Sequence, residues 1–114
     1  MSPLREPTFL LLTALAAGPL HGYAAIKEVV ALSDDRVQLR AGTLYAALDR
    51  LTGEGLVQLD REDVVEGRLR RYSRLTDTGA AVLEREAELL RRNASAAAER
   101  LRRRPGARPA TGAC

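Results

Sequence analysis

The hydrophobic positions near the middle of the chain follow the period of a helix and then stop at two glycines. Leu44, Leu48 and Leu51 fall on one stripe of a helical wheel. The opposite side is small and polar and consists of Gly42, Thr43, Ala46, Asp49 and Arg50. Gly53 and Gly55 favour the left-handed backbone that ends a helix, and an apolar, β-branched run follows them. This pattern predicts a short amphipathic helix that leads into a strand.

Two further helices are predicted before this one. The first begins after Pro7 and ends at Gly18, and its apolar run also resembles a short signal peptide. We favour the helix, because Phe9 and its apolar neighbours fit one helical face. The second helix opens near His21 and ends in the loop residues 33–35, and its residues at core spacing are Tyr23, Ile26, Val29 and Val30. Residues 37–39 alternate and predict a very short strand.

A β-hairpin is predicted after the central helix. Residues 57–61 and 69–75 have the composition of antiparallel strands, and residues 62–68 form a turn that contains Gly67. Thr76 is the expected N-cap of the last helix, with Asp77 favourable in its first turn. Three helices followed by a hairpin predict a mainly α fold with a small β-hairpin, the winged helix-turn-helix.

The last helix is predicted over residues 77–103, before Pro105, and it carries the clearest periodicity in the chain. Its apolar positions alternate in steps of four and three: Leu83, Ala87, Leu90, Ala94, Ala97 and Leu101. So narrow a seam suits pairing with another helix, although the helix could also pack within its own subunit. We expect dimerisation, because three small helices and a hairpin cannot cover so long a helix. Phe9 and Leu12 are expected in the same interface.

These boundaries divide the chain into three parts. Residues 1–76 form the winged helix-turn-helix domain, residues 77–104 the C-terminal dimerisation helix, and residues 105–114 a disordered tail. The chain has 18 basic and 15 acidic residues, and its net charge of +3 is by itself weak evidence for a polyanionic partner. The clustering of arginine is more informative, since the predicted hairpin carries Arg68, Arg70, Arg71 and Arg74.

The sparse cysteine and histidine content argues against several classes of chemistry. Cys114 is the only cysteine, so an intrachain disulfide and a cysteine-based zinc site are excluded, and the single histidine, His21, argues against a multi-histidine metal site and a histidine-based triad. No nucleophile-base pair or phosphate loop is present, and we therefore expect neither an enzyme nor a cofactor or metal. No apolar run approaches the ~20 residues of a membrane span, and a cytoplasmic location is expected.

The chain resembles the PadR family of transcriptional regulators, in the short form with a single C-terminal helix. Four segments carry the resemblance: residues 21–23 with Ile26, residues 42–45 with Leu48 and Leu51, residues 54–57, and residues 71–76 with Gly79. The resemblance implies dimeric winged-helix DNA-binding proteins, usually repressors, some of which respond to small aromatic molecules. Ala41 and Ala46 depart from the family, which often has proline at these positions.

Candidate DNA-binding residues lie on the polar side of the central helix and near the tip of the hairpin. On the helix they are Gly42, Thr43, Tyr45, Ala46 and Arg50, where small residues permit close approach to the major groove. On the hairpin they are Arg68 and Arg70, placed to contact phosphates or the minor groove, whereas Arg71 is expected to serve structure. The alternative for both groups is an ordinary solvated surface.

We therefore expect a sequence-specific transcriptional regulator that binds double-stranded DNA. It is expected to act as a homodimeric, ligand-responsive repressor on a pseudopalindromic operator, with a small aromatic effector at the dimer interface and no membrane partner. The alternative is a protein–protein interaction module of the same fold that does not bind DNA. Affinity that falls steeply with salt would distinguish the DNA-binding protein.

Overall fold

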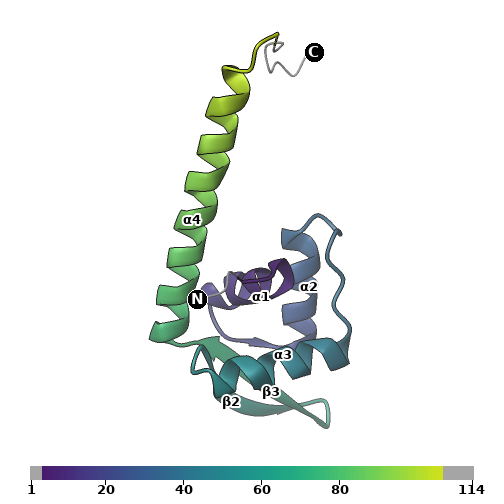
Figure 1. Cartoon of the computed structure of the whole chain (residues 1–114). Helices are drawn as coiled ribbons and strands as arrows, with labels where there is room; N and C mark the ends of the chain where they lie inside the picture. The colour runs from purple at the N-terminus through teal and green to yellow at the C-terminus, as the bar shows by residue number, and fades with distance from the viewer. Residues whose placement is uncertain (1–3, 107–114) are drawn as a thin grey trace.

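The computed structural model describes residues 4–106 and contains four helices and a three-stranded sheet (Figure 1). The elements are α1 (Glu6–Ala16), β1 (Leu20–His21), α2 (Gly22–Leu32), α3 (Ala41–Gly53), β2 (Val57–Val65), β3 (Arg68–Leu75) and α4 (Asp77–Arg102). The mainly α winged-helix fold expected from the sequence is confirmed. Most of the predicted tail, residues 107–114, lies outside the described residues.

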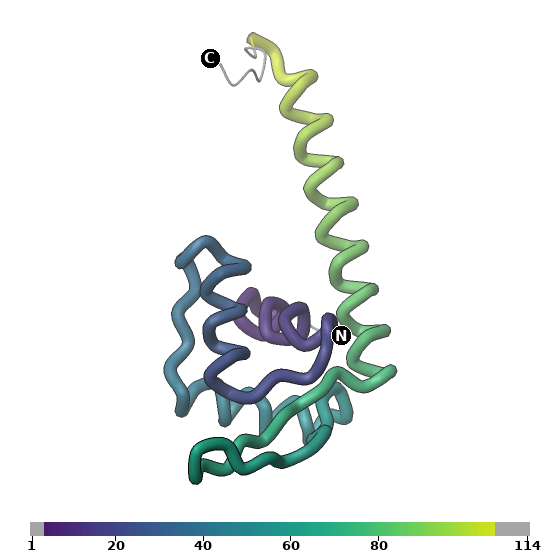
Figure 2. Tube along the Cα trace, turned by 180° about the vertical axis from the view of Figure 1, so that it is seen from behind, coloured from purple at the N-terminus to yellow at the C-terminus, as the bar shows by residue number. Residues whose placement is uncertain are grey.

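Helix α1 occupies the centre of the core. Its Leu11, Leu12 and Leu15 are 1%, 0% and 2% exposed. Helices α2 and α4 both pack against it, and the two opposite views show it enclosed between them (Figure 2). A helix that is apolar on nearly every side is stable where other elements surround it. The run that resembles a signal peptide is therefore the central helix of the domain.

The hairpin is longer than the sequence predicted. The turn expected over residues 62–68 is wrong, because β2 continues to Val65 and only Glu66 and Gly67 form the turn. Both turn residues have positive φ, 53° and 76°, as in two-residue turns whose twist matches that of the flanking strands. The extra length carries the tip well beyond the helices.

A third strand, β1, was not predicted. It pairs antiparallel with β3, and Leu20 lies opposite Ser73 while His21 lies opposite Tyr72. The sheet order is β1-β3-β2. Two residues carry no periodic signal in the sequence, so the pairing follows from the position of β3 and not from local pattern.

The strand predicted over residues 37–39 is also wrong, since this segment is an irregular part of the α2–α3 connection. Ser33, 1% exposed, organises the connection. Its hydroxyl donates to the Val30 carbonyl at 3.2 Å and accepts from the Val37 amide at 2.9 Å. Because a side chain satisfies the Val37 amide, the segment folds as a local turn motif without a β ladder.

The inner stripe of α2 also differs from the expected one. Gly22, Ala25 and Val29 are its buried residues, whereas Tyr23 is 68% exposed. The placement of Tyr23 in the core is therefore wrong, because it lies one residue away from the buried stripe. Its ring instead lies 5.5 Å from the ammonium group of Lys27.

Helix α4 begins at the predicted cap and then leaves the domain. The Thr76 hydroxyl accepts a hydrogen bond from the Gly79 amide at 2.9 Å. Val82 is buried in the core and Leu83 packs against it. Farther along, the helix extends away from the other elements, and the molecule measures 62 × 31 × 21 Å (Figures 1 and 2).

Candidate nucleic-acid interface

The start of α3 and the tip of the hairpin lie on the same side of the domain, opposite the side from which α4 rises (Figure 1). Leu44 and Leu51 are 0% and 1% exposed and hold α3 on the core. Gly42, Thr43 and Ala46 are exposed. The small and polar side of α3 identified in the sequence is therefore an open surface, next to the hairpin.

Tyr45 lies on this surface but is only partly free. Its side chain remains 53% exposed, and its ring rests against Gly22 at the start of α2. The hydroxyl end of Tyr45 is the part nearest to Gly22, and about half of the side chain remains open to solvent. The sequence indicated Tyr45 as a candidate but gave no sign of its contact with Gly22.

Arg50 lies toward the other end of α3, where it contacts α1. Its guanidinium donates to the Thr8 hydroxyl at 3.1 Å. The side chain is exposed, yet it is separated from Gly42 and Thr43 by two turns of helix. Arg50 therefore lies at the edge of the surface that the other α3 candidates form.

The hairpin arginines divide into paired and unpaired groups. Arg61, Arg71 and Arg74 each have a carboxylate within ion-pair distance, the Arg71–Glu62 pair being the closest interstrand one at 2.9 Å. Within residues 4–106, Arg68 and Arg70 have no such partner. The two arginines that the sequence indicated as candidate DNA contacts are thus the two hairpin arginines without a carboxylate at ion-pair distance, although Asp63 lies opposite Arg70 in the strand register.

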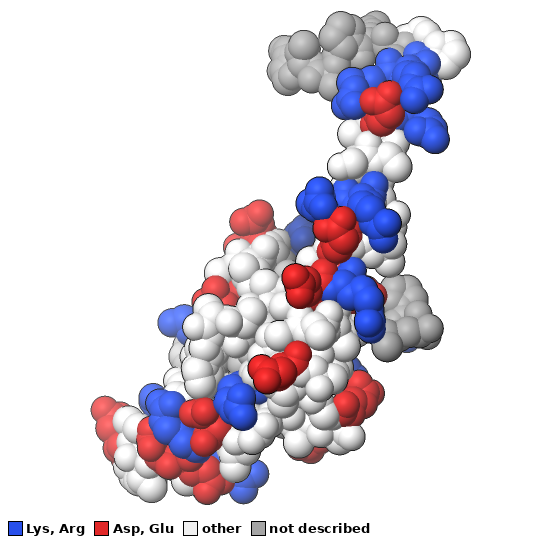
Figure 3. Space-filling model, turned by 90° about the vertical axis from the view of Figure 1, so that its left-hand side faces the viewer, with Lys and Arg blue, Asp and Glu red and all other residues white. Residues whose placement is uncertain are grey.

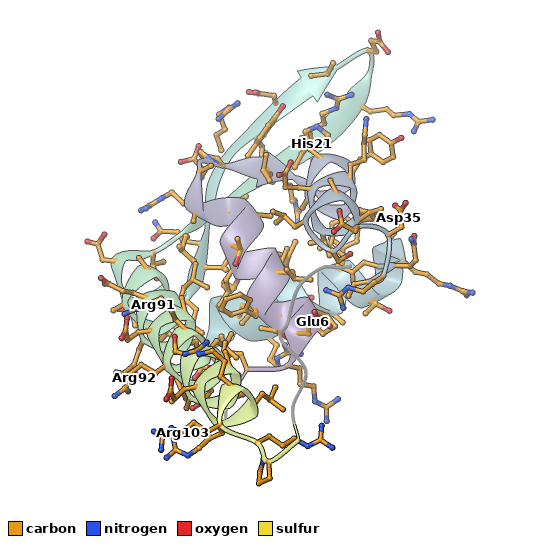
Figure 4. All side chains as sticks on the ribbon, turned by 90° about the horizontal axis from the view of Figure 1, so that it is seen from above. Glu6, His21, Asp35, Arg91, Arg92 and Arg103 are labelled. Atoms are coloured by element: carbon orange, nitrogen blue, oxygen red, sulfur yellow. The ribbon has the colours of Figure 1, made fainter. Side chains whose placement is uncertain are left out.

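Aromatic and cationic groups meet where β1 joins the hairpin. The His21 and Tyr72 rings meet edge to face at 5.3 Å, and the Arg61 guanidinium lies 3.9 Å from the centre of the Tyr72 ring. Burial, and after it the positive charge of Arg70, lowers the pKa of His21. His21 lies on the hairpin side of the domain, close to β3 (Figure 4).

Sequence reasoning missed Arg40. It is the N-cap residue of α3, it is exposed, and no hydrogen bond or ion pair of its side chain is found within residues 4–106. The only signal in the sequence was a lone basic residue directly before the helix. Its position adds a positive charge to the start of α3, on the same open surface as Thr43.

The predicted dimerisation residues fall into three groups. Leu12 is 0% exposed inside its own subunit, so its assignment to an interface is wrong: it has no surface to offer a partner. Phe9 and Leu83 are partly buried against the core. The remaining residues, Ala87, Leu90, Ala94, Ala97 and Leu101, are all exposed along α4.

The surface of α4 carries its charges in two clusters. Figure 3 shows Lys/Arg and Asp/Glu side chains grouped around the middle and around the far end of the helix, with an uncharged band between them. The band corresponds to residues 93–98, which are all Asn, Ala or Ser. Leu90 and Leu101, at the two edges of the band, are 51% and 60% exposed.

A hollow of about 410 Å³ lies between the end of α1 and α2. Thr13, Ala14, Glu28 and Leu32 are among its lining residues, and neither Phe9 nor any residue of α4 belongs to it. It is therefore separate from the dimer interface, where the sequence predicted an effector.

None of the helices described in residues 4–106 has the length and apolar composition needed to cross a membrane.

Comparison with known proteins gives one family. The sequence model of the "Transcriptional regulator PadR-like family" matches residues 11–85. A 37.1 kDa protein in transposon TN4556 of Streptomyces fradiae is 45% identical over 87 residues, which cover 76% of this chain. The match covers only 24% of that relative's length.

Solved structures show the same fold. A PadR family transcription regulator from Clostridium difficile R20291 is 23% identical with a TM-score of 0.71, over 85% of this chain and 99% of that chain. Bacillus subtilis PadR, crystallised in complex with operator DNA, is 23% identical with a TM-score of 0.62, over 70% of this chain and 45% of that chain. The arrangement of helices and hairpin described above is the one these structures share.

Proposed function

The chain belongs to the PadR-like family of transcriptional regulators, and from this premise we propose that it binds specific DNA sequences as a homodimer. The start of α3 enters the major groove, with Gly42, Thr43, Tyr45 and Ala46 facing the base edges. Arg68 and Arg70 contact the neighbouring phosphates or minor groove. The observation that carries the proposal is that the start of α3, whose outer side is exposed, lies on the same side of the domain as the hairpin tip, whose strand β3 carries two arginines without an ion-pair partner in residues 4–106.

Arg40 and Arg50 have different roles in this arrangement. Arg40, exposed at the N-cap of α3, extends the positive surface toward the backbone at the entry to the groove. Arg50, bonded to Thr8, lies nearer the edge and contacts a phosphate at the periphery if it contacts DNA at all. We therefore expect a larger loss of affinity on removal of Arg40 than of Arg50.

The homodimer forms through α4. An exposed leucine and alanine seam on a helix that extends from its domain is stabilised by a second copy. Charge favours an antiparallel pair: residues 77–92 contain four carboxylates and three arginines, whereas residues 93–104 contain one carboxylate and four arginines. Antiparallel pairing sets the arginine-rich end beside the more acidic base of the partner.

A twofold dimer presents two copies of α3 to one face of the duplex. The expected operator is pseudopalindromic, with half-site centres about 10 bp apart or a multiple of that spacing. Occupation of promoter DNA then represses transcription. A small aromatic effector bound near Phe9, between α1 and α4 of the dimer, releases the DNA by favouring a dimer in which the two α3 helices are wrongly spaced.

The salt dependence of binding tests this proposal. A duplex selected from random sequences by the purified protein is titrated by fluorescence anisotropy at several salt concentrations. The wild type should lose affinity steeply with salt, and Arg68→Ala or Arg70→Ala should each reduce the slope by about one unit. Arg71→Gln is the matched control, because Arg71 is already paired with Glu62 and its loss should leave the slope unchanged.

Two results contradict the proposal. If the selection enriches no duplex and the wild type does not bind DNA at low salt, the fold serves as a protein–protein interaction module. If DNA is bound but the slope is the same for Arg68→Ala, Arg70→Ala and Arg71→Gln, the hairpin does not contact phosphate.

A further inference from the structure

Gly22, the first residue of α2, has no space for a side chain. A Cβ atom built there would lie 2.9 Å from Cζ and 3.2 Å from Cε1 of the Tyr45 ring, and it would also collide with the Tyr45 hydroxyl. In proteins, a Cβ atom essentially never lies within 3.0 Å of a heavy atom that belongs neither to its own residue nor to the two neighbours in the chain. The Tyr45 ring therefore occupies the volume that any larger residue at position 22 would need.

Backbone conformation does not explain this glycine. Gly22 is the first helical residue of α2 and is absent from the positive-φ glycines of the described chain, which are Gly18, Gly55, Gly67 and Gly106. Its backbone conformation is therefore one that any residue can adopt. The three heavy atoms nearest to a Cβ at this position all belong to Tyr45, so the steric reason for glycine here is the Tyr45 side chain.

The contact joins the two helices of the helix-turn-helix at the surface where DNA is proposed to bind. Tyr45 comes from the open side of α3, and 53% of it remains exposed. Leu44, its neighbour in sequence, is fully buried and fixes the direction in which Tyr45 leaves the helix. The Tyr45 side chain therefore reaches from α3 to the start of α2, and its hydroxyl end is the part that lies nearest to Gly22.

We propose that Gly22 is a positioning residue for DNA binding: its missing side chain lets Tyr45 lie against α2 and present its hydroxyl in one fixed place. This inference rests on the proposed function. A methyl group at position 22 forces the ring to swing outward, because the obstructing atoms belong to the end of a rotatable side chain. Gly22 itself contacts no DNA and acts through Tyr45 alone.

A double-mutant cycle tests the coupling. Dissociation constants for the selected duplex are measured at low salt for the wild type, Gly22→Ala, Tyr45→Ala and the double variant. Gly22→Ala should weaken binding about tenfold, the loss of roughly one hydrogen bond to a charged group. In the Tyr45→Ala background the same substitution should change affinity by less than about twofold, since the space it needs is then empty.

Gly53→Ala is the matched control. Gly53 is also helical, lies at the end of α3, and a Cβ there would have nothing within 4 Å. The affinity of the Gly53→Ala variant for the duplex should equal that of the wild type. Equal losses for Gly22→Ala with and without Tyr45, or no loss in either background, would overturn the positioning role.

A DNA-free readout separates this inference from the proposed function. In protein labelled with fluorotyrosine, the fluorine resonance of Tyr45 is assigned by its absence from Tyr45→Phe. It should shift in Gly22→Ala and stay in place in Gly53→Ala. An unmoved resonance would show that the ring is not displaced and would overturn the inference even if the wild type binds DNA. If the resonance moves but the protein binds no duplex, the contact between Tyr45 and Gly22 is supported and only its role in DNA binding is rejected.

Discussion

The first turns of α4 and its outer part share one apolar period but meet different surroundings. At the base, Val82 is 9% exposed and Leu83 packs on the core of its own subunit. Beyond Glu86, whose carboxylate accepts from the Leu4 amide, the same seam continues with Leu90 and Leu101 more than half exposed. One heptad pattern thus runs from a part that packs on the domain to a part that is exposed, and the exposed part is the surface that we propose for dimerisation.

The base is held by a small set of backbone contacts. The Thr76 amide donates to the Leu56 carbonyl at 3.1 Å, and the Thr76 hydroxyl donates to the Gly55 carbonyl at 2.6 Å. Gly79 lies so close to the Leu56 carbonyl that no side chain fits between them. These contacts fix the direction of α4 relative to the end of α3, and hence the spacing of two α3 helices in the proposed dimer.

The outer part is held by side-chain pairs on its own surface. Glu88 pairs with Arg91 and Arg92, and Glu99 pairs with Arg102 and Arg103. Exposed pairs of this kind contribute little to stability and cannot replace packing. The base is therefore held within one subunit, while the outer part remains exposed and, in the proposed dimer, would be covered by a second copy.

The largest expected effect comes from charges placed in the outer seam. Leu90→Glu combined with Leu101→Glu should give a folded monomer in sedimentation equilibrium, because two carboxylates per chain would face their counterparts or an apolar seam. With one half-site bound at a time, affinity for the full operator should fall by a factor on the order of 10²–10⁴.

Ala96→Glu provides the control for this double variant. It adds the same charge to the exposed outer part of α4 but off the seam, and it should leave both mass and affinity unchanged. A dimer that persists in Leu90→Glu with Leu101→Glu would show that the outer seam is not the interface.

At the base, Gly79→Ala should destabilise the domain by about 1–3 kcal/mol. The new methyl group would collide with the Leu56 carbonyl oxygen and lie 2.8 Å from Cδ1 of Leu75, and backbone cannot move aside as a side chain can. Urea unfolding at one fixed protein concentration measures the loss. Gly53→Ala, with open space around it, should be neutral or more stable, so equal stability of the two variants would contradict the close approach of α4 to Leu56.

A smaller loss is expected when the cap is removed. Thr76→Ala deletes the acceptor for the Gly79 amide and the donor to the Gly55 carbonyl, and an N-cap is worth about 1 kcal/mol. Thermal unfolding of Thr76→Ala should therefore show a lower midpoint than that of Thr78→Ala, an exposed threonine that makes neither bond. Coincident midpoints would mean that packing alone determines where α4 begins.

The smallest expected effect is a change in helix content with pH, and it arises from the ion pairs on the outer part of α4. The hydrogen bond from Arg103, and then that from Arg102, lowers the pKa of Glu99 below 4.5. Because the folded helix favours the carboxylate, this stabilisation is present above pH 4.5 and is lost as the pH falls through the lowered pKa. Circular dichroism should show helix content decreasing on acidification, and less steeply in Glu99→Gln. Identical pH profiles would show that the pairs do not support the outer helix.

A structural feature can be predicted from the sequence when the residues that determine it lie close together along the chain. The cap at Thr76, the stripe of Leu44 and Leu51, and the run of α4 depend on residues within two turns of one another, and all were predicted. Strand β1 and the length of the hairpin depend on pairing with β3, and the coil at residues 37–39 depends on one side-chain hydrogen bond, from the Val37 amide to the Ser33 hydroxyl. There, local pattern gave no answer or a wrong one.

The candidate site shows the same division. The polar front of α3 and the arginine-rich hairpin were evident in the sequence, as was the family resemblance. The register of β2 against β3 sets Glu62 opposite Arg71 and Asp63 opposite Arg70. Glu62 pairs with Arg71 across the hairpin, whereas Asp63 pairs with Arg61 on its own strand, so the placement of side chains decided which arginines have no ion-pair partner. The contact of Tyr45 with Gly22 joins residues on two helices, and it has no signature in either segment alone.

By itself, the sequence determined the order of elements, the faces of α3 and α4, and the membership of a family of transcriptional regulators. Only the tertiary structure decided which part of each face remains available. It buried Leu12 and attached the base of α4, and it left Leu90, Leu101 and Arg68 exposed. The physical reason is that periodicity specifies the direction of a side chain from its helix axis, whereas burial depends on whether another element occupies that direction.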